Sequence, residues 1–281
     1  MSRSNNSGSH PRIALLPSSS MGHLMPFLRL AVSLTAHDIQ ITLITAHLTV
    51  SLAESDILDQ FLSAFPQVIH HKMLIQPTND NSMVEKCEDP FTLQYEAIRR
   101  SSHILSPLLS SCLPPLSALI TDMSLTFMVV PITKAVNLPN YILFTTCAKM
   151  LAIYAFYHKM EVHMWDNRDD IIIPGLPPIP KLWLPPPLLS NSNNLLKAHF
   201  TENGKNFIAT NGILVNTFEE FEKESLAALN SGVIIDQLPP VIAIGPLVPS
   251  TFERGEILTW LENQPCQSVL YVSFGTRAGL I

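Results

Sequence analysis

The chain has 281 residues, of which 47% are hydrophobic and 14% are charged, and its formal net charge is −6 at pH 7. This length suffices for one large or two modest domains, and an acidic chain without basic clusters gives no indication of nucleic-acid binding. The apolar runs are all far shorter than a bilayer span, so the high hydrophobic content favours strands buried in a parallel sheet together with a surface that meets another partner. Four scattered cysteines lack metal-binding or redox spacing, which fits a reducing, cytoplasmic compartment: Cys87, Cys112, Cys147 and Cys266.

The first predicted unit is a strand, a small polar loop and a helix. The polar residues 1–11 are expected to form a disordered tail. Ile13–Leu16 is an uninterrupted apolar run, typical of a strand that is covered on both faces. Pro17 and three serines end this strand, and a loop with Gly22 and His23 follows. From Leu24 onward, apolar residues recur at helical spacing.

After this unit, strand and helix patterns alternate, which is typical of a doubly wound parallel sheet. Further strands are predicted at Gln40–Thr45, Val68–Leu74, Leu116–Thr121, Asn140–Phe144, Gly212–Asn216 and Val241–Ile244. Helices are predicted over Leu48–Phe65, Pro90–Ser111, Ser124–Val136, Cys147–His163 and Phe218–Leu229, and the polar stretch Thr78–Asp89 predicts a loop. We expect Pro107 to bend or shorten the second helix, and Arg99 and Arg100 to lie on its solvated side.

The middle of the chain is rich in proline. Pro174–Pro187 contains seven prolines, which excludes regular helix and interior strand. We expect extended surface chain here, packed on the domain by Leu182, Trp183 and Leu184, and then a turn-rich break at Asn191–Asn194.

The last part of the chain reads as the start of a new unit. A short hinge-like stretch after Gly245–Pro246 leads to a small helix around Ile257–Glu262 and a strand at Val269–Ser273. That strand runs into Phe274–Gly275–Thr276, where glycine allows backbone N–H groups to approach a phosphate. We therefore expect one α/β domain over residues 12–246 and a second unit that begins at residue 247.

His23 and Asp122 are the candidate catalytic residues. Each follows the end of a buried strand, and open α/β sheets bind ligands at the edge where the carboxyl ends of parallel strands meet. A helix N-terminus favours a neutral imidazole, which is a competent general base, and a neighbouring carboxylate fixes its tautomer. Two plainer alternatives stay open. In the first, His23 only caps or packs the turn. In the second, Asp122 only caps the helix that follows it.

Other chemistries have less support. Ser18–Ser20 beside these two residues would suit a Ser-His-Asp hydrolase, but the sequence lacks a G-x-S-x-G nucleophile elbow. His158, Glu161 and His163 would suit a metal, but a separation of five residues does not align the two histidines on one helical face. The sequence contains neither G-x-G-x-x-G nor a Walker A motif, so dehydrogenase and P-loop functions have no support.

Several segments carry a resemblance to a known family. They are SSSMGHLMPFLRLA, DPFTLQYEAIRRSSHIL, PPLSALITD, NLPNYILFTTCAKM, GILVNTFEEFE and WLENQPCQSVLYVSFGT. In this order they resemble the plant UDP-sugar-dependent glycosyltransferases, and VSLAES, EAIRRS and PPLSALITD resemble the flavonoid C-glycosyltransferase group within them. The resemblance covers the chain from about residue 11.

The resemblance implies a GT-B fold, with two Rossmann-like lobes. Residues 12–246 would be a complete N-terminal acceptor-binding lobe, and residues 247–281 the start of a C-terminal nucleotide-sugar-binding lobe. His23 would then remove the phenolic proton of a flavonoid-like polyphenol, and Asp122 would orient and balance His23. The phenolic oxygen, or the ring carbon that it activates, would displace UDP from UDP-glucose with inversion.

The resemblance also assigns contacts to further residues. Donor contacts fall on Thr145, Ser273, Gly275 and Thr276, and acceptor contacts on Gly22, Phe91 and Tyr95, the last two being equally well ordinary core aromatics. No metal or cofactor beyond the UDP-sugar is implied, and the full-length protein would be a cytoplasmic monomer without a membrane span.

The sequence departs from the family in one respect. The donor-binding signature box, with its His-Cys-Gly-Trp-Asn-Ser run, is absent, so we expect a C-terminally truncated chain that is inactive alone. The alternative is a non-catalytic small-molecule-binding lobe or interaction partner.

Overall fold

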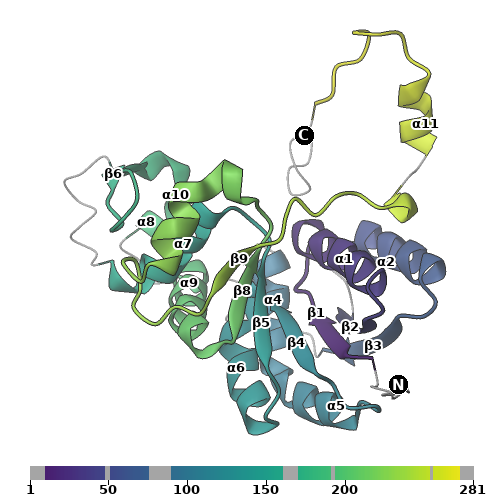
Figure 1. Ribbon diagram of the computed structural model, residues 1–281, viewed down its shortest axis with the longest axis horizontal. Helices are drawn as coiled ribbons and strands as arrows, with labels where there is room; N and C mark the ends of the chain where they lie inside the picture. Colours follow the sequence, from purple (N-terminus) through teal and green to yellow (C-terminus); the bar gives the residue numbers. More distant parts are fainter. Residues whose placement is uncertain are drawn as a thin grey trace, which may run out of the picture.

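The computed structural model describes residues 10–47, 51–75, 90–160, 170–190, 194–253 and 256–272. Seven strands in this part of the chain form one parallel sheet with the order β3-β2-β1-β4-β5-β8-β9 (Figure 1). They are β1 (Arg12–Leu16), β2 (Gln40–His47), β3 (Ile69–Leu74), β4 (Ala118–Asp122), β5 (Asn140–Phe144), β8 (Gly212–Val215) and β9 (Val241–Ala243). The predicted α/β class with a parallel sheet is thereby confirmed.

Helices cover both faces of the sheet. The longer ones are α1 (Met21–Thr35), α2 (Leu52–Ala64), α4 (Pro90–Arg100), α5 (Leu105–Ser111), α6 (Thr126–Ala135), α7 (Ala148–Phe156), α9 (Leu195–Asn206) and α10 (Glu219–Asn230). Successive side chains of a strand point to opposite faces. Leu15 of β1 accordingly packs in a core with α1 and α2, whereas Ala14 and Leu16 pack in a second core with α4, α5 and α6. This two-sided burial explains why the strands read as continuous apolar runs.

A third core lies between β5, β8 and the helices α7, α9 and α10. Its centre is aromatic: the ring of Tyr154 stacks on Phe200 at a centroid distance of 4.0 Å and on Phe207 at 5.4 Å. Tyr154 and Phe207 are almost completely buried. This packing holds α9 against α7 beside the carboxyl edge of the sheet.

The segment after β9 is fastened to α1 and α2. The guanidinium of Arg29 donates to both carboxylate oxygens of Glu253 at 2.6–3.2 Å and to the carbonyl of Leu247 at 3.2 Å. Phe252 meets Phe61 edge-on at a centroid distance of 5.4 Å. Residues on both sides of the predicted boundary at residue 246 thus contact the same body, and the two-domain division stays a prediction.

Helix α1 begins earlier than the sequence pattern indicated. The backbone carbonyl of Ser20 accepts hydrogen bonds from the N–H groups of His23 and Leu24, at 3.0 and 2.9 Å. Gly22 and His23 therefore lie in the first turn of α1 and not in the preceding loop.

Two other predicted helices are shorter than expected. The helix predicted over Pro90–Ser111 ends at Arg100, and a 3₁₀ turn over Ser102–Ile104 separates it from α5. Pro107 lies in the first turn of α5, where no backbone N–H is needed, whereas an unbroken helix would hold it in its interior, so the break agrees with the shortening expected from Pro107. The helix predicted over Cys147–His163 is α7, which ends at Phe156 before a 3₁₀ turn.

Arg99 and Arg100 lie on the solvated side of α4 as predicted, and they also form ion pairs. Both side chains are 40% exposed, yet both donate to the carboxylate of Glu96, whose side chain is 6% exposed. These bonds hold the pKa of Glu96 below its ordinary value against the opposing effect of burial.

The proline-rich segment has more local structure than predicted. Its strand β7 (Ile179–Pro180) pairs antiparallel with β6 (Asp170–Ile171), which lies just before the segment. A 3₁₀ turn at Lys181–Trp183 and the short helix α8 (Pro186–Leu189), which begins in the segment, follow. Leu184 is buried as expected, but Leu182 and Trp183 are 83% and 59% exposed.

Two further differences concern the second half of the chain. Helix α9 was not predicted at all. The predicted strand at Val269–Ser273 is wrong over Val269–Val272, because these residues are irregular and exposed. Ser273 lies outside the described residues. The loop predicted earlier in the chain, over Thr78–Asp89, also lies outside them. The small predicted helix is present as α11 (Glu256–Glu262).

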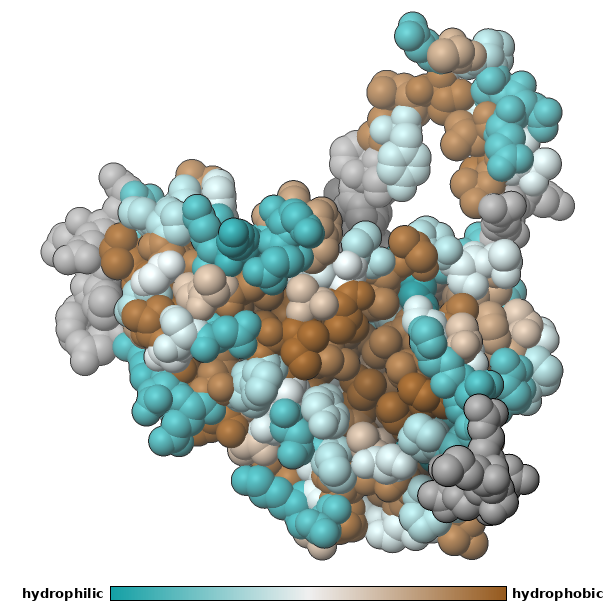
Figure 2. Space-filling view, viewed as in Figure 1, coloured by the Kyte–Doolittle hydropathy of each residue, from teal (hydrophilic) through white to brown (hydrophobic). Residues whose placement is uncertain are grey.

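Apolar residues also reach the surface. Figure 2 shows them gathered at the centre of one face, over the sheet between α10 and α1. Ile242 of β9 and Val248 after it are 47% and 67% exposed. No helix in the described part of the chain is long and apolar enough to cross a membrane.

Candidate active site

The candidate site lies at the carboxyl edge of the sheet, between β1 and β4. These strands are parallel neighbours, with Leu16 paired to Thr121. The chain leaves β1 through the serine-rich loop and enters α1, which carries His23 in its first turn. Asp122 is the last residue of β4. Because β1 and β4 are parallel neighbours, His23 and Asp122 meet at the same edge of the sheet, as predicted from their positions after the two strands.

His23 and Asp122 form a direct pair. Nδ1 of His23 lies 2.8 Å from Oδ2 of Asp122, and the carboxylate is fully buried whereas the His23 side chain is 26% exposed. An ionised carboxylate only accepts hydrogen bonds, so Nδ1 carries the proton and, in the neutral ring, Nε2 carries the lone pair. This is the tautomer that a general base needs at Nε2.

The second carboxylate oxygen of Asp122, Oδ1, binds Ser124. Oδ1 accepts hydrogen bonds from the backbone N–H of Ser124, at 2.9 Å, and from its hydroxyl group. Asp122 thus caps the 3₁₀ turn Met123–Leu125 and binds His23 at the same time. Burial alone would raise the pKa of Asp122, but the charge and hydrogen bond of His23 and the bonds from Ser124 outweigh it and keep the pKa below its ordinary value.

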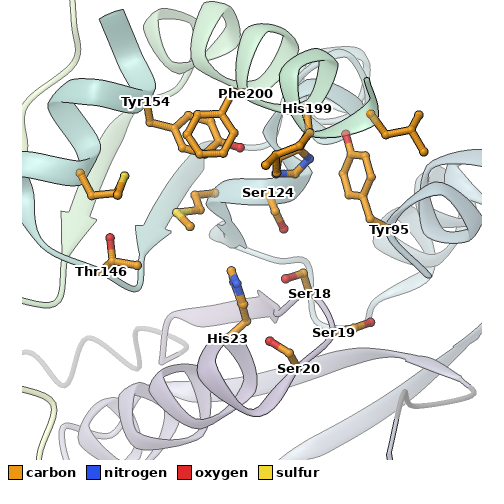
Figure 3. A pocket seen from close by; sticks show the side chains of 14 residues that line it. Ser18, Ser19, Ser20, His23, Tyr95, Ser124, Thr146, Tyr154, His199 and Phe200 are labelled. Atoms are coloured by element: carbon orange, nitrogen blue, oxygen red, sulfur yellow. The ribbon is translucent and has the colours of Figure 1, made fainter. Parts of the chain in front are cut away.

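A cavity of about 290 Å³ opens in front of this pair (Figure 3). Its lining comes from the β1–α1 loop, the first turn of α1, α4, the turn after β4, the β5–α7 loop, α7 and α9. The lining residues are Ser18, Ser19, Ser20, His23, Tyr95, Met123, Ser124, Thr146, Met150, Tyr154, Leu195, Leu196, His199 and Phe200. The volume and the aromatic walls suit a planar molecule of one or two rings.

The residues predicted to contact the donor and the acceptor lie in different places relative to the cavity. Tyr95 lines the cavity, and it is Thr146, not Thr145, that does so. Gly22 is not among the lining residues. Phe91 belongs to α4, but its side chain lies outside the described part of the structure, as do Ser273, Gly275 and Thr276. These assignments stay predictions.

Helix α9 supplies the part of the site that sequence reasoning missed. His199 and Phe200 line the cavity, and Asn203 lies behind them. The signal that was present is Asn194, read as part of a turn: its side chain accepts from the N–H of Lys197 at 3.0 Å and caps α9.

The cavity wall is kept neutral. Burial lowers the pKa of His199 to about 4. Burial also raises the pKa of Tyr95 and that of Tyr154 above the ordinary value. At neutral pH these side chains therefore present uncharged groups to the cavity. The described residues contain no group of His, Cys, Asp or Glu side chains that could hold a metal ion.

Comparison with known proteins identifies relatives of the whole chain. No family model matches. UDP-glycosyltransferase 708G2 of Citrus unshiu is 47% identical over 293 residues, covering 100% of this chain and 61% of that protein. UDP-glycosyltransferase CGT of Oryza sativa subsp. japonica is 40% identical, covering 97% of this chain and 59% of that protein.

Two solved structures are also similar to this chain over most of its length. LpCGTa in complex with UDP has a TM-score of 0.80 and 41% identity, covering 97% of this chain and 61% of its own. TcCGT1 in complex with UDP has a TM-score of 0.75 and 26% identity, covering 92% of this chain and 56% of its own. The chain spans about three fifths of the length of the relatives it matches. In sequence and in fold, the chain is a relative of the plant UDP-glycosyltransferases over that three fifths of their length.

Proposed function

We propose that this chain forms the acceptor side of an inverting UDP-sugar-dependent glycosyltransferase that transfers glucose from UDP-glucose to a flavonoid-like polyphenol. The observation that carries the proposal is the His23–Asp122 pair, 2.8 Å apart at the mouth of an aromatic cavity. UDP is bound in the related structures LpCGTa and TcCGT1, which supports a UDP-sugar as the donor.

In the proposed mechanism, Nε2 of His23 takes the proton of a phenolic hydroxyl group. The ionised Asp122 stabilises the imidazolium that forms, and the lowered pKa of Asp122 supports this role. The phenolate oxygen then attacks the anomeric carbon of the sugar, the bond to UDP breaks, and the configuration inverts.

The same base serves a C-linked product. Loss of the phenolic proton to His23 makes the ortho ring carbon nucleophilic, and this carbon forms the bond to the sugar as the bond to UDP breaks. The hydrogen of that carbon then leaves as a proton to water, which restores the aromatic ring as a phenolate, and the phenolate takes the proton back from His23. We propose the C-glycoside as the product because the chain resembles the flavonoid C-glycosyltransferase group.

The remaining assignments belong to the same proposal. Thr145, Ser273, Gly275 and Thr276 contact the donor, and Gly22, Phe91 and Tyr95 contact the acceptor. The transfer uses no metal and no cofactor besides the UDP-sugar, and the whole protein acts as a cytoplasmic monomer. This chain alone does not turn over UDP-glucose.

The test compares two proteins with UDP-glucose and phloretin, followed by mass spectrometry. One is this chain; the other is a fusion of this chain to the part of the Citrus unshiu relative that it does not match. We expect product from the fusion alone, and fragmentation separates C-linked from O-linked glucose. In the fusion, His23→Ala should abolish the product, whereas His37→Ala, at an exposed position at the end of α1, should retain it.

Three outcomes would contradict the proposal in different ways. Product from this chain alone would refute its inactivity. Activity retained in the His23→Ala fusion would remove His23 from the base role. Binding of phloretin by this chain, with no product from a folded fusion, would favour the alternative of a non-catalytic binding lobe.

A further inference from the structure

Residues 245–253, here called the linker, leave the sheet after β9 and run from the end of β8 to α1 and α2 (Figure 1). The start of the linker is held by two backbone hydrogen bonds. The N–H of Gly245 donates to the carbonyl of Thr217 at 2.8 Å, and the N–H of Leu247 donates to Oδ1 of Asn216 at 2.9 Å. Leu247 is buried in the core that α1 and α2 form on the sheet. The linker is thus packed chain from its first residues.

One arginine fastens the far end of the linker. Nε of Arg29, on α1, donates to Oε1 and Oε2 of Glu253 at 3.0 and 3.2 Å, and Nη2 donates to Oε2 at 2.6 Å. Nη1 of the same guanidinium donates to the carbonyl of Leu247 at 3.2 Å. Oε1 of Glu253 also accepts from the N–H of Ser250 at 2.8 Å. A single guanidinium therefore binds the linker at two points and closes the stretch between them.

The surroundings strengthen this anchor. The side chains of Arg29 and Glu253 are 26% and 12% exposed, so water and salt screen the pair less than a fully exposed one. A guanidinium that donates through two nitrogens fixes the orientation of a carboxylate as well as its distance. Phe252 meets the rings of Phe61 and Phe65 edge-on, at centroid distances of 5.4 and 6.1 Å. The linker is therefore held by charge on α1 and by aromatic packing at α2.

The chain beyond the linker makes a contrast. Ile257, Trp260 and Leu270 are all exposed, and Figure 1 shows α11 standing away from the sheet and its helices. Arg29 lies on the same helix as His23, about 9 Å further along at a rise of about 1.5 Å per residue. The last anchored part of the chain is thus fastened to the element that carries the proposed base.

We propose that Arg29 is a positioning residue, whose bonds to Leu247 and Glu253 fix the linker on α1 and so set where the chain that leads to the donor-binding part leaves the acceptor side. The inference rests on the proposed function, because it concerns the donor contacts proposed at residues 273–276. A loose linker presents the sugar correctly to His23 for only a fraction of the time, and the apparent affinity for the donor falls by that fraction.

The first test uses this chain alone and requires no enzymatic activity. In hydrogen–deuterium exchange mass spectrometry, the peptide that covers the linker should exchange about tenfold faster in Arg29→Met, because the charge-assisted bonds that close it are lost. Arg29→Lys keeps one cationic donor and should show a smaller increase. Arg99→Met is the matched control: it removes another arginine that pairs with a glutamate, on α4, and should leave the exchange of the linker unchanged.

A double variant shows whether the bonds act as one unit. Glu253→Gln keeps an acceptor for the N–H of Ser250 but removes the charge that Arg29 binds, so it should also speed exchange of the linker. Arg29→Met combined with Glu253→Gln should exchange no faster than Arg29→Met alone, because both substitutions break the same bonds.

The second test measures kinetics in the fusion described above. Arg29→Met should raise KM for UDP-glucose about tenfold and leave KM for phloretin within about twofold, because neither Arg29 nor the linker lines the acceptor cavity. A merely structural role would lower kcat, through loss of folded protein, with both KM values unchanged. Arg29→Lys should restore part of the donor KM, and Arg99→Met should keep it at the wild-type value.

The outcomes distinguish the anchor from the function beneath it. Unchanged exchange of the linker in folded Arg29→Met, as judged by circular dichroism, would overturn the anchor and leave the proposed function standing. Faster exchange with an unchanged KM for UDP-glucose would overturn the positioning role. No product from a folded wild-type fusion would overturn the proposed function and the role of Arg29 in donor binding together. If Arg29→Met does not fold, Glu253→Gln decides in its place.

Discussion

His23 Nδ1 and Asp122 Oδ2 are 2.8 Å apart although 99 residues separate them in the sequence. The contact exists because β1 and β4 are adjacent and parallel, so the turns that follow them meet at one edge of the sheet. The same aspartate holds the Ser124 N–H through its other oxygen. The hydrogen bond from Ser124 therefore fixes the orientation of the carboxylate that accepts from His23.

The first prediction concerns the tautomer of His23. In Asp122→Asn, the Ser124 N–H still requires an acceptor, so the amide oxygen should take the place of Oδ1 and the NH₂ group should face His23. Nδ1 then has to accept, and the proton moves to Nε2. We expect ¹⁵N–¹H correlation spectra of the His23 ring to report the Nδ1–H form in the wild type and the Nε2–H form in the variant.

A control separates this effect from a general disturbance of the site. Ser124→Ala removes the hydroxyl group but keeps the backbone donor, so the Nδ1–H form should persist. In an active fusion, Asp122→Asn should lower kcat by about 10²–10⁴-fold with little change in KM, because the loss concerns the base and not acceptor binding. A His23 ring that keeps its proton on Nδ1 in Asp122→Asn would contradict the assigned geometry.

The sequence was sufficient to predict this pair, for a physical reason. Continuous apolar runs are typical of strands buried on both faces, and polar residues directly after such strands collect at one edge of a parallel sheet. His23 and Asp122 were found by that rule. The rule places residues at an edge of the sheet but does not locate the start of a helix. The prediction of a loop at Gly22 and His23 is therefore wrong, because the hydrogen bonds to the Ser20 carbonyl that begin α1 do not affect the apolar pattern.

The missed wall of the site had a weaker signal. Helix α9 has two buried residues, Asn203 and Gly204, and these are not the apolar residues that periodicity detects. Its Asn194 cap follows a stretch that reads as a turn. The side chain of Asn203 lies beside the ring of His199 and is held by the N–H of Phe127 from another helix. No local pattern carries such information.

The second prediction concerns the close approach of α9 to α7. A Cβ atom on Gly204 would lie 2.5 Å from the backbone carbonyl oxygen of Tyr154, and a backbone atom cannot step aside. Gly204→Ala should therefore lower the free energy of unfolding in urea by about 1–3 kcal/mol. Gly22→Ala is the matched control: a Cβ there meets nothing within 4 Å, so the helix propensity of alanine should leave stability unchanged or raise it by up to about 1 kcal/mol. Equal effects of the two substitutions would contradict the contact.

The third prediction concerns the start of α7. The carboxylate of Glu222 accepts hydrogen bonds from the N–H groups of Ala148 and Lys149, at 2.8 and 3.1 Å, and no side chain of α7 itself caps that end. Glu222 leaves the helical backbone conformation within α10 to do so. Because α7 carries Met150 and Tyr154 of the cavity, this cap also positions the site.

Substitution of Glu222 should therefore destabilise the chain in a graded way. We expect Glu222→Ala to lower the free energy of unfolding by about 1–2 kcal/mol, because both N–H groups lose their acceptor next to the positive end of the helix dipole. Glu222→Gln keeps a carbonyl acceptor and should cost less. Glu224→Ala, at an exposed position of the same helix, should stay within about 0.5 kcal/mol of the wild type. The same loss in all three variants would show that the bonds to α7 are not the cause.

The last prediction uses the pKa of His199, which burial lowers from 6.5 to about 4. Between these two values the unfolded chain binds a proton at His199 that the folded chain does not, so the free energy of unfolding must fall as the pH falls from about 6.5 to about 4, and His199 adds no slope above that range. His199→Phe removes this contribution. The stability of the variant relative to the wild type should thus rise on acidification by up to about 1.4 kcal/mol per pH unit, in urea titrations at pH 7, 6 and 5. His37→Phe, at an exposed position, should instead follow the wild type at each pH. A His199→Phe difference that stays constant from pH 7 to pH 5 would mean that the His199 ring is hydrated enough in the folded chain to titrate normally.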